Sequence, residues 1–269
     1  MPTLSGKVAV VTGGALGIGK AIALRFAAEG ASVAIWDINQ DEAQSVEAEI
    51  KKAGGTSLTV VADVGTRSEV ASALEQTAKE FGYVDILVNN VGIFSAFNFL
   101  DIPEESWNEM LRVNLTSAFS CSQLVAQNMI EGKREGRIIN IGSVDGGIPY
   151  EGFAHYNVSK AGMRMLSQAS SLGLARHKIT VNEIAPGFIL TEMSRSVIET
   201  DVFAERVGSF APLARVGTAD EVASAALFLA SSEASYITGS VLTIDGGSVI
   251  AGRSWIQQRY FVQDGFLPE

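Results

Sequence analysis

The chain has 269 residues and a formal net charge of −10, from 20 Lys and Arg against 30 Asp and Glu. This acidic balance argues against a nucleic-acid-binding surface, which would carry clustered basic residues. Hydrophobic residues make up 47% of the chain, which excludes a disordered protein and predicts a large core. No apolar run reaches the roughly 18 residues of a membrane span. The N-terminus carries no signal-peptide pattern, and the single cysteine, Cys121, can form no disulfide within the chain. We therefore expect a cytoplasmic protein with no metal site.

Short runs of aliphatic and β-branched residues alternate with longer amphipathic stretches along the chain. Strands are predicted at residues 7–12, 32–37, 58–62, 86–89, 137–141, 180–184 and 241–244. Helices are predicted between them at residues 17–29, 40–53, 67–81, 104–130, 154–177 and 219–230. Unbroken Val, Ile and Leu runs indicate strands buried on both faces. The alternation of strand and helix therefore predicts an α/β fold with a parallel sheet.

Three helix boundaries carry local signals. Thr66 or Ser68 could cap the third helix, and the pair Gly54 and Gly55 is suited to ending the second. Thr218 and Glu221 have the spacing of a capping box at the start of the last helix.

A glycine-rich loop, TGGALGIG at residues 12–19, joins the first strand to the first helix. Exposed N–H groups and the helix dipole at such a junction favour a pyrophosphate, and glycines let the backbone approach it. The spacing of Gly13, Gly17 and Gly19 is G-x-x-x-G-x-G, which differs from the G-x-G-x-x-G dinucleotide fingerprint. A tight strand-to-helix turn without a ligand is the alternative interpretation.

An acidic residue, Asp37, ends the second strand. A carboxylate there can accept hydrogen bonds from the adenosine ribose and would repel the 2′-phosphate of NADP. Neither the glycine loop nor the residues that follow Asp37 supply a cation for that phosphate, so we predict NAD as the cofactor. Alternatively, Asp37 or Asn39 only caps the second helix. Asp63, after the third strand, could bind the adenine amino group or serve as a turn residue.

Ser143 follows the fifth strand, and Tyr156 and Lys160 come shortly afterwards in a helical stretch. Residues at i and i+4 lie on one helix face. An adjacent ammonium favours the phenolate and lowers the pKa of a tyrosine, so the pair is suited to acid–base chemistry near neutral pH. The alternative is a surface tyrosine packed beside a solvated lysine.

Taken together, these residues resemble the short-chain dehydrogenase/reductase family. The matching segments are residues 12–19, Asp37, Asp63, residues 89–92 (Asn-Asn-Val-Gly), Asn114, Ser143, Tyr156, Lys160, Pro186 and Gly187. They occur in the family's order and span nearly the whole chain. The resemblance implies a single-domain Rossmann-like doubly wound parallel sheet of about seven strands, with helices on both faces, over residues 1–269.

The resemblance also implies a role for each catalytic residue. Tyr156 would be the general acid/base that exchanges a proton with the substrate oxygen, and Ser143 would hydrogen-bond that oxygen. Lys160 would lower the pKa of Tyr156 and hold the nicotinamide ribose. Asn114 would hold a water in a proton relay. As an alternative, Asn114 is a polar residue that bends its helix.

The implied NAD site consists of Gly13, Leu16, Gly17, Ile18, Gly19, Asp37, Ile38, Asp63, Val64, Asn90, Val91, Gly92, Tyr156, Lys160, Pro186, Gly187, Ile189 and Thr191. Val91 stands where the family more often has alanine.

The predicted substrate pocket contains Phe94, Asp145, Tyr150, Phe153 and Met193. These residues are mostly apolar, so an uncharged hydrophobic or cyclic secondary alcohol is favoured. A sugar or polyol dehydrogenase, a 3-oxoacyl-thioester reductase and a non-catalytic NAD-binding protein are the alternatives. An enoyl reductase is disfavoured, because its tyrosine and lysine are spaced more widely. His155 is expected to point away from the site.

The resemblance further implies a homotetramer. The helices at 104–130 and 154–177 would form one interface, and the last helix and last strand the other. Residues 188–217 are a candidate lid. The C-terminal extension at 248–269 carries four aromatic residues, and we expect it to pack on a neighbouring subunit.

Overall fold

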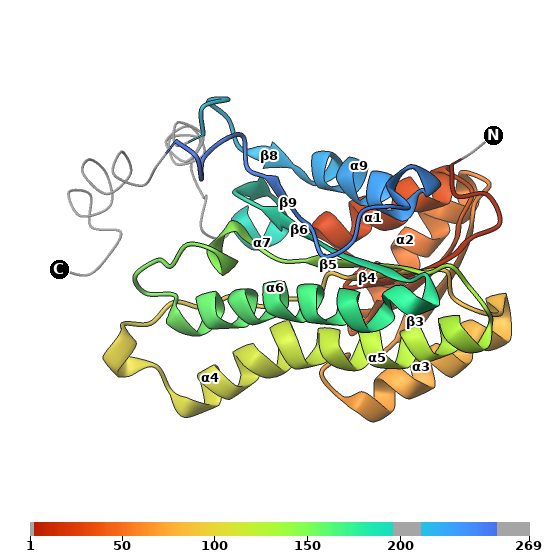
Figure 1. Cartoon of the computed structure of the whole chain (residues 1–269), viewed down its shortest axis with the longest axis horizontal. Coiled ribbons are helices and arrows are strands. Elements are labelled where there is room, and N and C mark those ends of the chain that lie inside the picture. Colours follow the sequence, from red (N-terminus) through yellow and green to blue (C-terminus); the bar gives the residue numbers. More distant parts are fainter. Residues whose placement is uncertain (1–2, 196–210, 252–269) are drawn as a thin grey trace.

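The computed structural model describes residues 3–195 and 211–251, and its centre is one parallel sheet (Figure 1). Seven strands lie in the order β3-β2-β1-β4-β5-β6-β9. Their bounds are β1 Val8–Thr12, β2 Ser32–Asp37, β3 Thr56–Val61, β4 Ile86–Asn89, β5 Arg137–Ile141, β6 Thr180–Pro186 and β9 Val241–Ile244. All six pairings are parallel, so the predicted seven-stranded Rossmann-like sheet is confirmed.

The strand order reverses beside β1, which pairs with β2 on one side and with β4 on the other. The chain runs outward from β1 to β3 and then crosses to β4 on the opposite side. In an open α/β sheet, ligands bind at such a switch point, beyond the carboxyl ends of the strands. Both the glycine loop after β1 and the loop after β4 reach this point.

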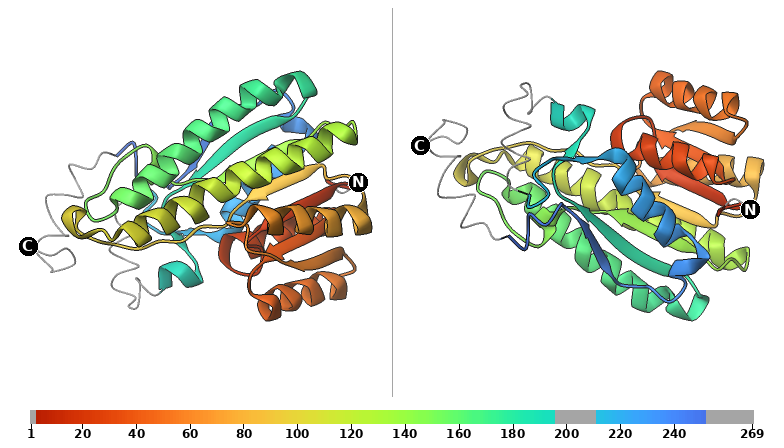
Figure 2. Two further views of the ribbon diagram at one scale, coloured as in Figure 1. Left: turned by 90° about the horizontal axis from the view of Figure 1, so that it is seen from below. Right: turned by 90° about the horizontal axis from the view of Figure 1, so that it is seen from above.

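Helices cover both faces of the sheet (Figures 1 and 2). One layer consists of α1 Gly17–Ala28, α2 Gln40–Lys52 and α9 Ala219–Ala230. The other consists of α3 Arg67–Phe81, α4 Glu104–Leu111, α5 Ser117–Glu131 and α6 Ala154–Leu174. Every residue of β1, β4, β5 and β6 is buried, because these strands face a hydrophobic core on each side.

The predicted helices ended one residue late at 29 and 53, where α1 ends at Ala28 and α2 at Lys52, and three residues late at 177, where α6 ends at Leu174. The stretch at 104–130 is not one α-helix, because a π-helical turn at Arg112–Thr116 separates α4 from α5. Thr66 precedes α3 but makes no side-chain cap bond, so the predicted cap there was wrong. The capping box of Thr218 and Glu221 is confirmed, and Gly54 follows α2 with a φ of +86°.

Two short elements follow β6. Strand β7 (Ile189–Leu190) pairs in parallel with β8 (Gly217–Thr218), and α7 spans Glu192–Arg195. Half of the candidate lid, at 196–210, and most of the C-terminal extension, at 252–269, lie outside the described residues. Among the residues described, no helix is long and apolar enough to cross a membrane.

Candidate active site

The glycine loop leaves the N-terminus of α1 open. Leu16, the residue before α1, makes no side-chain cap bond, and the first turn carries no acidic residue. The N–H groups of that turn are therefore available to an anionic ligand. Gly13 and Gly17 have φ values of +62° and +54°, which favour glycine. At Gly19, a Cβ would overlap the carbonyl oxygen of Gly13, so only glycine lets α1 come this close to the loop. These features fit a bound pyrophosphate.

Asn90, after β4, holds the loop in place. Its Nδ2 donates to the carbonyl oxygens of Thr12 and Gly13 at 3.1 and 3.0 Å. In return, Thr12 Oγ1 accepts from the backbone N–H groups of Asn90 and Val91. The two loops that meet at the switch point are therefore linked to each other.

Asp37 faces the glycine loop from the end of β2. Its carboxylate accepts from the backbone N–H of Ala15 at 3.0 Å and from that of Asn39 at 2.9 Å. The capping role belongs to Asn39, whose side chain accepts from the Glu42 N–H at the start of α2. Ile38 follows Asp37 in the chain and Leu16 follows Ala15, and these two side chains expose 72% and 42% of their surface. Exposed apolar side chains near a carboxylate suit an adenosine.

Asp63 acts as a turn residue and also forms an ion pair that the sequence did not reveal. It accepts from the Gly65 N–H, and Arg112 Nη1 donates to its Oδ2 at 2.8 Å. Arg112 also bonds Glu109, so one guanidinium joins the turn after β3 to α4. Hydrogen bonds from Arg112 and Gly65 outweigh the effect of burial and lower the pKa of Asp63. Neighbouring Val64 is buried in the core, so only its backbone could meet a cofactor.

The predicted catalytic residues come together at the carboxyl end of β5. Lys160 is buried, and its Nζ donates to the carbonyl oxygen of Ile141 at 3.0 Å and lies 5.8 Å from the centre of the Tyr156 ring. Ser143 Oγ accepts from the Asp145 N–H at 3.1 Å, and Ser143 lies close enough to Tyr156 to act on the pKa of its phenol. Serine, tyrosine and lysine therefore share one site.

The acid–base state of this site differs from the sequence-based expectation. Burial raises the pKa of Tyr156, the Asp145 carboxylate raises it further, and the hydrogen bond with Ser143 only partly opposes them. Burial also lowers the pKa of Lys160 itself, to about 8. The pKa of Tyr156 in the protein alone is therefore raised, where the sequence predicted a lowered value.

Asn114 lies in the π-helical turn and is fully buried. Its amide accepts from the Ile93 N–H at 2.7 Å and donates to the Ile93 carbonyl oxygen at 3.0 Å and to Ser159 Oγ at 3.2 Å. Asn114 Oδ1 and Lys160 Nζ both lie within 4 Å of the point that a Cβ of Gly92 would occupy. Asn114 thus both lies in a helix irregularity and is close to Lys160.

Aromatic side chains surround the phenol of Tyr156. Phe94 contacts both Tyr156 and Phe153, with ring centres 5.2 and 4.9 Å apart, and Tyr150 lies 6.5 Å from Phe153. Three residues of the predicted substrate pocket therefore lie together. His155 is buried, and its Nε2 bonds Ser95 Oγ at 2.8 Å. The side chain of Met193 lies outside the described part of the structure.

The segment after β6 runs along the other side of the site. Thr191 lies 3.4 Å from the point that a Cβ of Gly17 would occupy, so it faces the glycine loop. Gly187 hydrogen-bonds the carbonyl of Ile244 in β9, and Ile189 is buried. The residues predicted at Pro186–Thr191 are thus near the dinucleotide loop.

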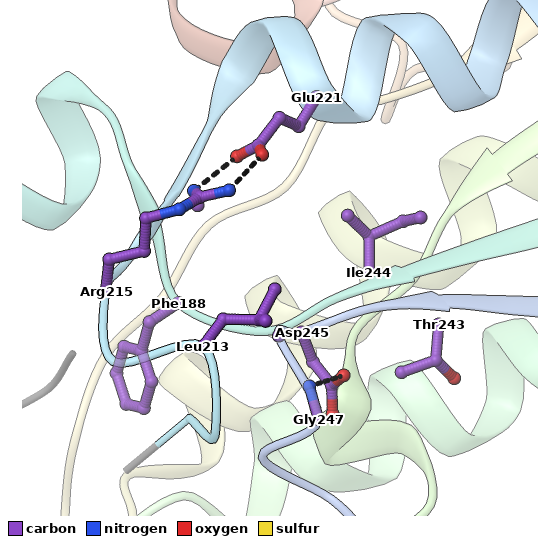
Figure 3. A pocket seen from close by; sticks show the side chains of 10 residues that line it. Phe188, Leu213, Arg215, Glu221, Thr243, Ile244, Asp245 and Gly247 are labelled. Carbon is purple, nitrogen blue, oxygen red and sulfur yellow. Dashed lines mark hydrogen bonds and ion pairs between the residues drawn. The ribbon is translucent and has the colours of Figure 1, made fainter. Parts of the chain in front are cut away.

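A cavity of about 450 Å³ opens beside this segment and was not predicted (Figure 3). It is lined by Phe188, Leu213, Arg215, Gly217, Glu221 and the residues 243–247. Arg215 and Glu221 form a two-pronged ion pair at its rim, with distances of 2.9 and 2.5 Å. In the sequence, the paired glycines Gly246 and Gly247, shortly after the end of β9, were a signal of an open turn at this cavity.

The matches to known proteins cover the glycine loop, the residues at the end of β5 and nearly all the rest of the chain. The family profile described as Enoyl-(Acyl carrier protein) reductase matches residues 13–249. A 3-oxoacyl-(acyl-carrier-protein) reductase of Thermotoga maritima is 40% identical over 92% of this chain and 99% of that protein. A 5-keto-D-gluconate 5-reductase of Escherichia coli is 34% identical over 93% of this chain and 98% of that protein. The crystal structure of a short-chain type dehydrogenase/reductase from Mycobacterium marinum has a TM-score of 0.87 and 38% identity, covering 91% of this chain and 96% of that one.

Proposed function

Because the chain belongs to the short-chain dehydrogenase/reductase family, and is thus an oxidoreductase acting on CH–OH groups, we propose that it uses NAD to interconvert a secondary alcohol and a ketone. The single observation that carries this proposal is the meeting of Ser143, Tyr156 and Lys160 at the end of β5, beside the glycine loop. An intact set of this kind argues against a non-catalytic NAD-binding protein.

The cofactor preference rests on Asp37. Its carboxylate is held toward the loop by the Ala15 N–H and would repel a 2′-phosphate. Lys20, the residue that follows the glycine loop, forms an ion pair with Glu49 at 3.1 Å. These contacts support NAD over NADP. When bound, the nicotinamide ring exchanges a hydride with the substrate carbon and, in its oxidised form, brings a positive charge to the site.

In the proposed mechanism, the chain's residues bind the substrate oxygen and move one proton. Ser143 Oγ donates a hydrogen bond to that oxygen. Tyr156 Oη gives its proton to a ketone or takes one from an alcohol. Because burial raises the pKa of Tyr156, the phenol stays protonated at neutral pH in the protein alone and is suited to the reduction direction. For oxidation, nearby positive charge, including that of Lys160, is needed to stabilise the phenolate. Asn114 would hold a water that carries the proton onward from Lys160.

The substrate class follows from the walls of the site. Phe94, Tyr150 and Phe153 give an aromatic surface next to Tyr156 and supply no fixed charge. This favours an uncharged, hydrophobic or cyclic secondary alcohol.

A 3-oxoacyl-thioester reductase is a second candidate, favoured by the 40% identity of this chain to the 3-oxoacyl-(acyl-carrier-protein) reductase of Thermotoga maritima.

We also propose the homotetramer that the family resemblance implies. Phe119, Val158, Met165 and Leu172 are exposed on α5 and α6, and Phe228 is exposed on α9. Exposed apolar residues on these helices support interfaces there. Sedimentation of the purified chain at a monomer's mass would contradict this proposal.

The catalytic proposal is tested by supplying NAD or NADP with a panel of secondary alcohols and recording reduced cofactor. The panel contains cyclic terpenols, sterols, polyols, sugars and 3-hydroxyacyl thioesters on carrier protein or on coenzyme A. We expect turnover of a hydrophobic alcohol with NAD; faster turnover of a carrier-bound thioester would favour the second candidate. Tyr156→Phe should abolish turnover while NAD still binds, and the control Tyr236→Phe, at a fully exposed tyrosine, should change nothing. Wild-type turnover by Tyr156→Phe would refute the mechanism.

A further inference from the structure

A charged pair lies between β6 and α6, with Glu183 fully buried and Arg164 partly exposed. Glu183 lies in the middle of β6, where every residue is buried, and is itself 0% exposed. Buried glutamates are rare unless they are paired. Its nearest cation is Arg164, whose Nε lies 3.6 Å from Glu183 Oε1, too far for a hydrogen bond. Within the described part of the chain, neither carboxylate oxygen of Glu183 has a hydrogen-bond partner, and the same holds for Arg164 Nε.

Two glycines make room for this pair. A Cβ at Gly142 would collide with the Glu183 carboxylate, and a Cβ at Gly147 would collide with Arg164 Nη1. Gly142 lies between Ile141, whose carbonyl oxygen accepts from Lys160 Nζ, and the catalytic candidate Ser143. The pair is therefore packed directly against the backbone that holds Lys160 and Ser143.

Lys160 has titratable neighbours on its own helix and on the side of the sheet. On α6, Tyr156 and Arg164 lie one turn before and one turn after it. From β6 it faces Glu183, and from the turn after β5 it faces Asp145. Strands β5 and β9 place uncharged residues, Asn140 and Val241, opposite Glu183 in the sheet. Burial lowers the pKa of Lys160 to about 8, and the Glu183 and Asp145 carboxylates oppose that effect. Of these two carboxylates, Glu183 is the one wholly removed from solvent.

We propose that Glu183, held by Arg164, is a positioning residue whose carboxylate keeps the Lys160 ammonium charged at the pH at which the enzyme works. Glu183 touches neither substrate nor cofactor and acts on turnover only through Lys160. The inference rests on the proposed function, since it needs Lys160 to assist Tyr156.

The decisive variant is Glu183→Gln, which keeps the shape of the side chain and removes its charge. Without that charge Lys160 loses its proton at a lower pH, and a neutral lysine no longer stabilises the phenolate. The alkaline limb of the pH profile of kcat/KM should move down by about one pH unit, which lowers turnover roughly tenfold on that limb. Turnover below pH 7 should stay within about twofold of the wild type. Arg164→Met should move the same limb in the same direction by less, because an unpaired Glu183 takes up a proton more readily.

The control is Glu135→Gln. Glu135 forms an ion pair with Lys178 at 2.9 Å, but both side chains are exposed, so its removal should leave the pH profile unchanged. A merely structural role for Glu183 would lower turnover equally at every pH, and that result would overturn the proposal. If Glu183→Gln does not fold, an unshifted limb in Arg164→Met overturns it instead. Because Tyr156→Phe tests the proposed function separately, an inactive Tyr156→Phe with an unshifted Glu183→Gln would refute this inference alone.

Discussion

Gly19→Ala tests how the glycine loop is built. The added Cβ would overlap the carbonyl oxygen of Gly13 and come within 2.5 Å of Asn90 Nδ2. The loop must then move, which strains it and breaks the two hydrogen bonds from Asn90 to Thr12 and Gly13. Overpacking costs about 1–3 kcal/mol and each of the two lost bonds about 0.5–1.5 kcal/mol, so the free energy of unfolding should fall by about 2–6 kcal/mol. The N–H groups that face the pyrophosphate move as well, so the affinity for NAD should fall more than tenfold.

The assay combines thermal unfolding with a titration of NAD. At roughly 2–4 °C for each kcal/mol, a loss of this size lowers Tm by roughly 4–24 °C. Gly173→Ala is the matched control, because Gly173 lies inside α6 and no atom lies within 4 Å of its Cβ position. There, alanine should raise the stability by about 0.5–1 kcal/mol and leave NAD binding unchanged. A Gly19→Ala variant with wild-type Tm and NAD affinity would refute the packing argument.

Three further variants test separate features. Asp37→Ser removes the carboxylate beside the loop and should raise the ratio of kcat/KM for NADP to that for NAD at least tenfold; an unchanged ratio would mean that the preference is set elsewhere. Asn140→Ala takes away the acceptor of Asn89 Nδ2 (2.7 Å) and the donor to Ser167 Oγ (2.8 Å), and should lower the unfolding free energy in urea by about 1–3 kcal/mol or more. Burial raises the pKa of Glu183 from 4.5 to about 7, so the folded chain binds more protons than the unfolded chain in that window. Its stability then falls as the pH rises through the window, by roughly 3 kcal/mol. Glu183→Gln removes this fall, so its Tm relative to wild type should be higher at pH 8 than at pH 5, and a constant difference would contradict the assignment.

The sheet and the glycine loop could be predicted from local patterns in the sequence. Strands β2, β4, β5 and β9 have the predicted bounds, because short β-branched runs between polar turns are buried on both faces and have no competing periodicity. The glycine spacing marked the loop, since only glycine tolerates the close approach at Gly19.

Features that depend on contacts between residues far apart in the chain could not be predicted from the sequence. The link from Arg112 to Asp63 joins residues 49 positions apart, and no local pattern announces it. The predicted direction of the pKa shift of Tyr156 was wrong, because the spacing of Tyr156 and Lys160 indicates a neighbouring charge but does not indicate burial. Glu183 did leave a signal, as an acidic residue inside a predicted buried strand, but its partner Arg164 is visible only in three dimensions.

The π-helical turn at Arg112–Thr116 contains one residue more than an α-helical path would need. Deleting one residue there would allow continuous i to i−4 bonding from Glu104 to Glu131, and the helix itself would gain from it. The same deletion would rotate α4 relative to α5 by about 100°. The Asn114 amide would lose its alignment with Ile93, and Arg112 would swing away from Asp63. One inserted residue therefore sets the rotation of α4 about the helix axis relative to α5. With this rotation α5 packs on the core, and the turn between the two helices presents Asn114 to the site.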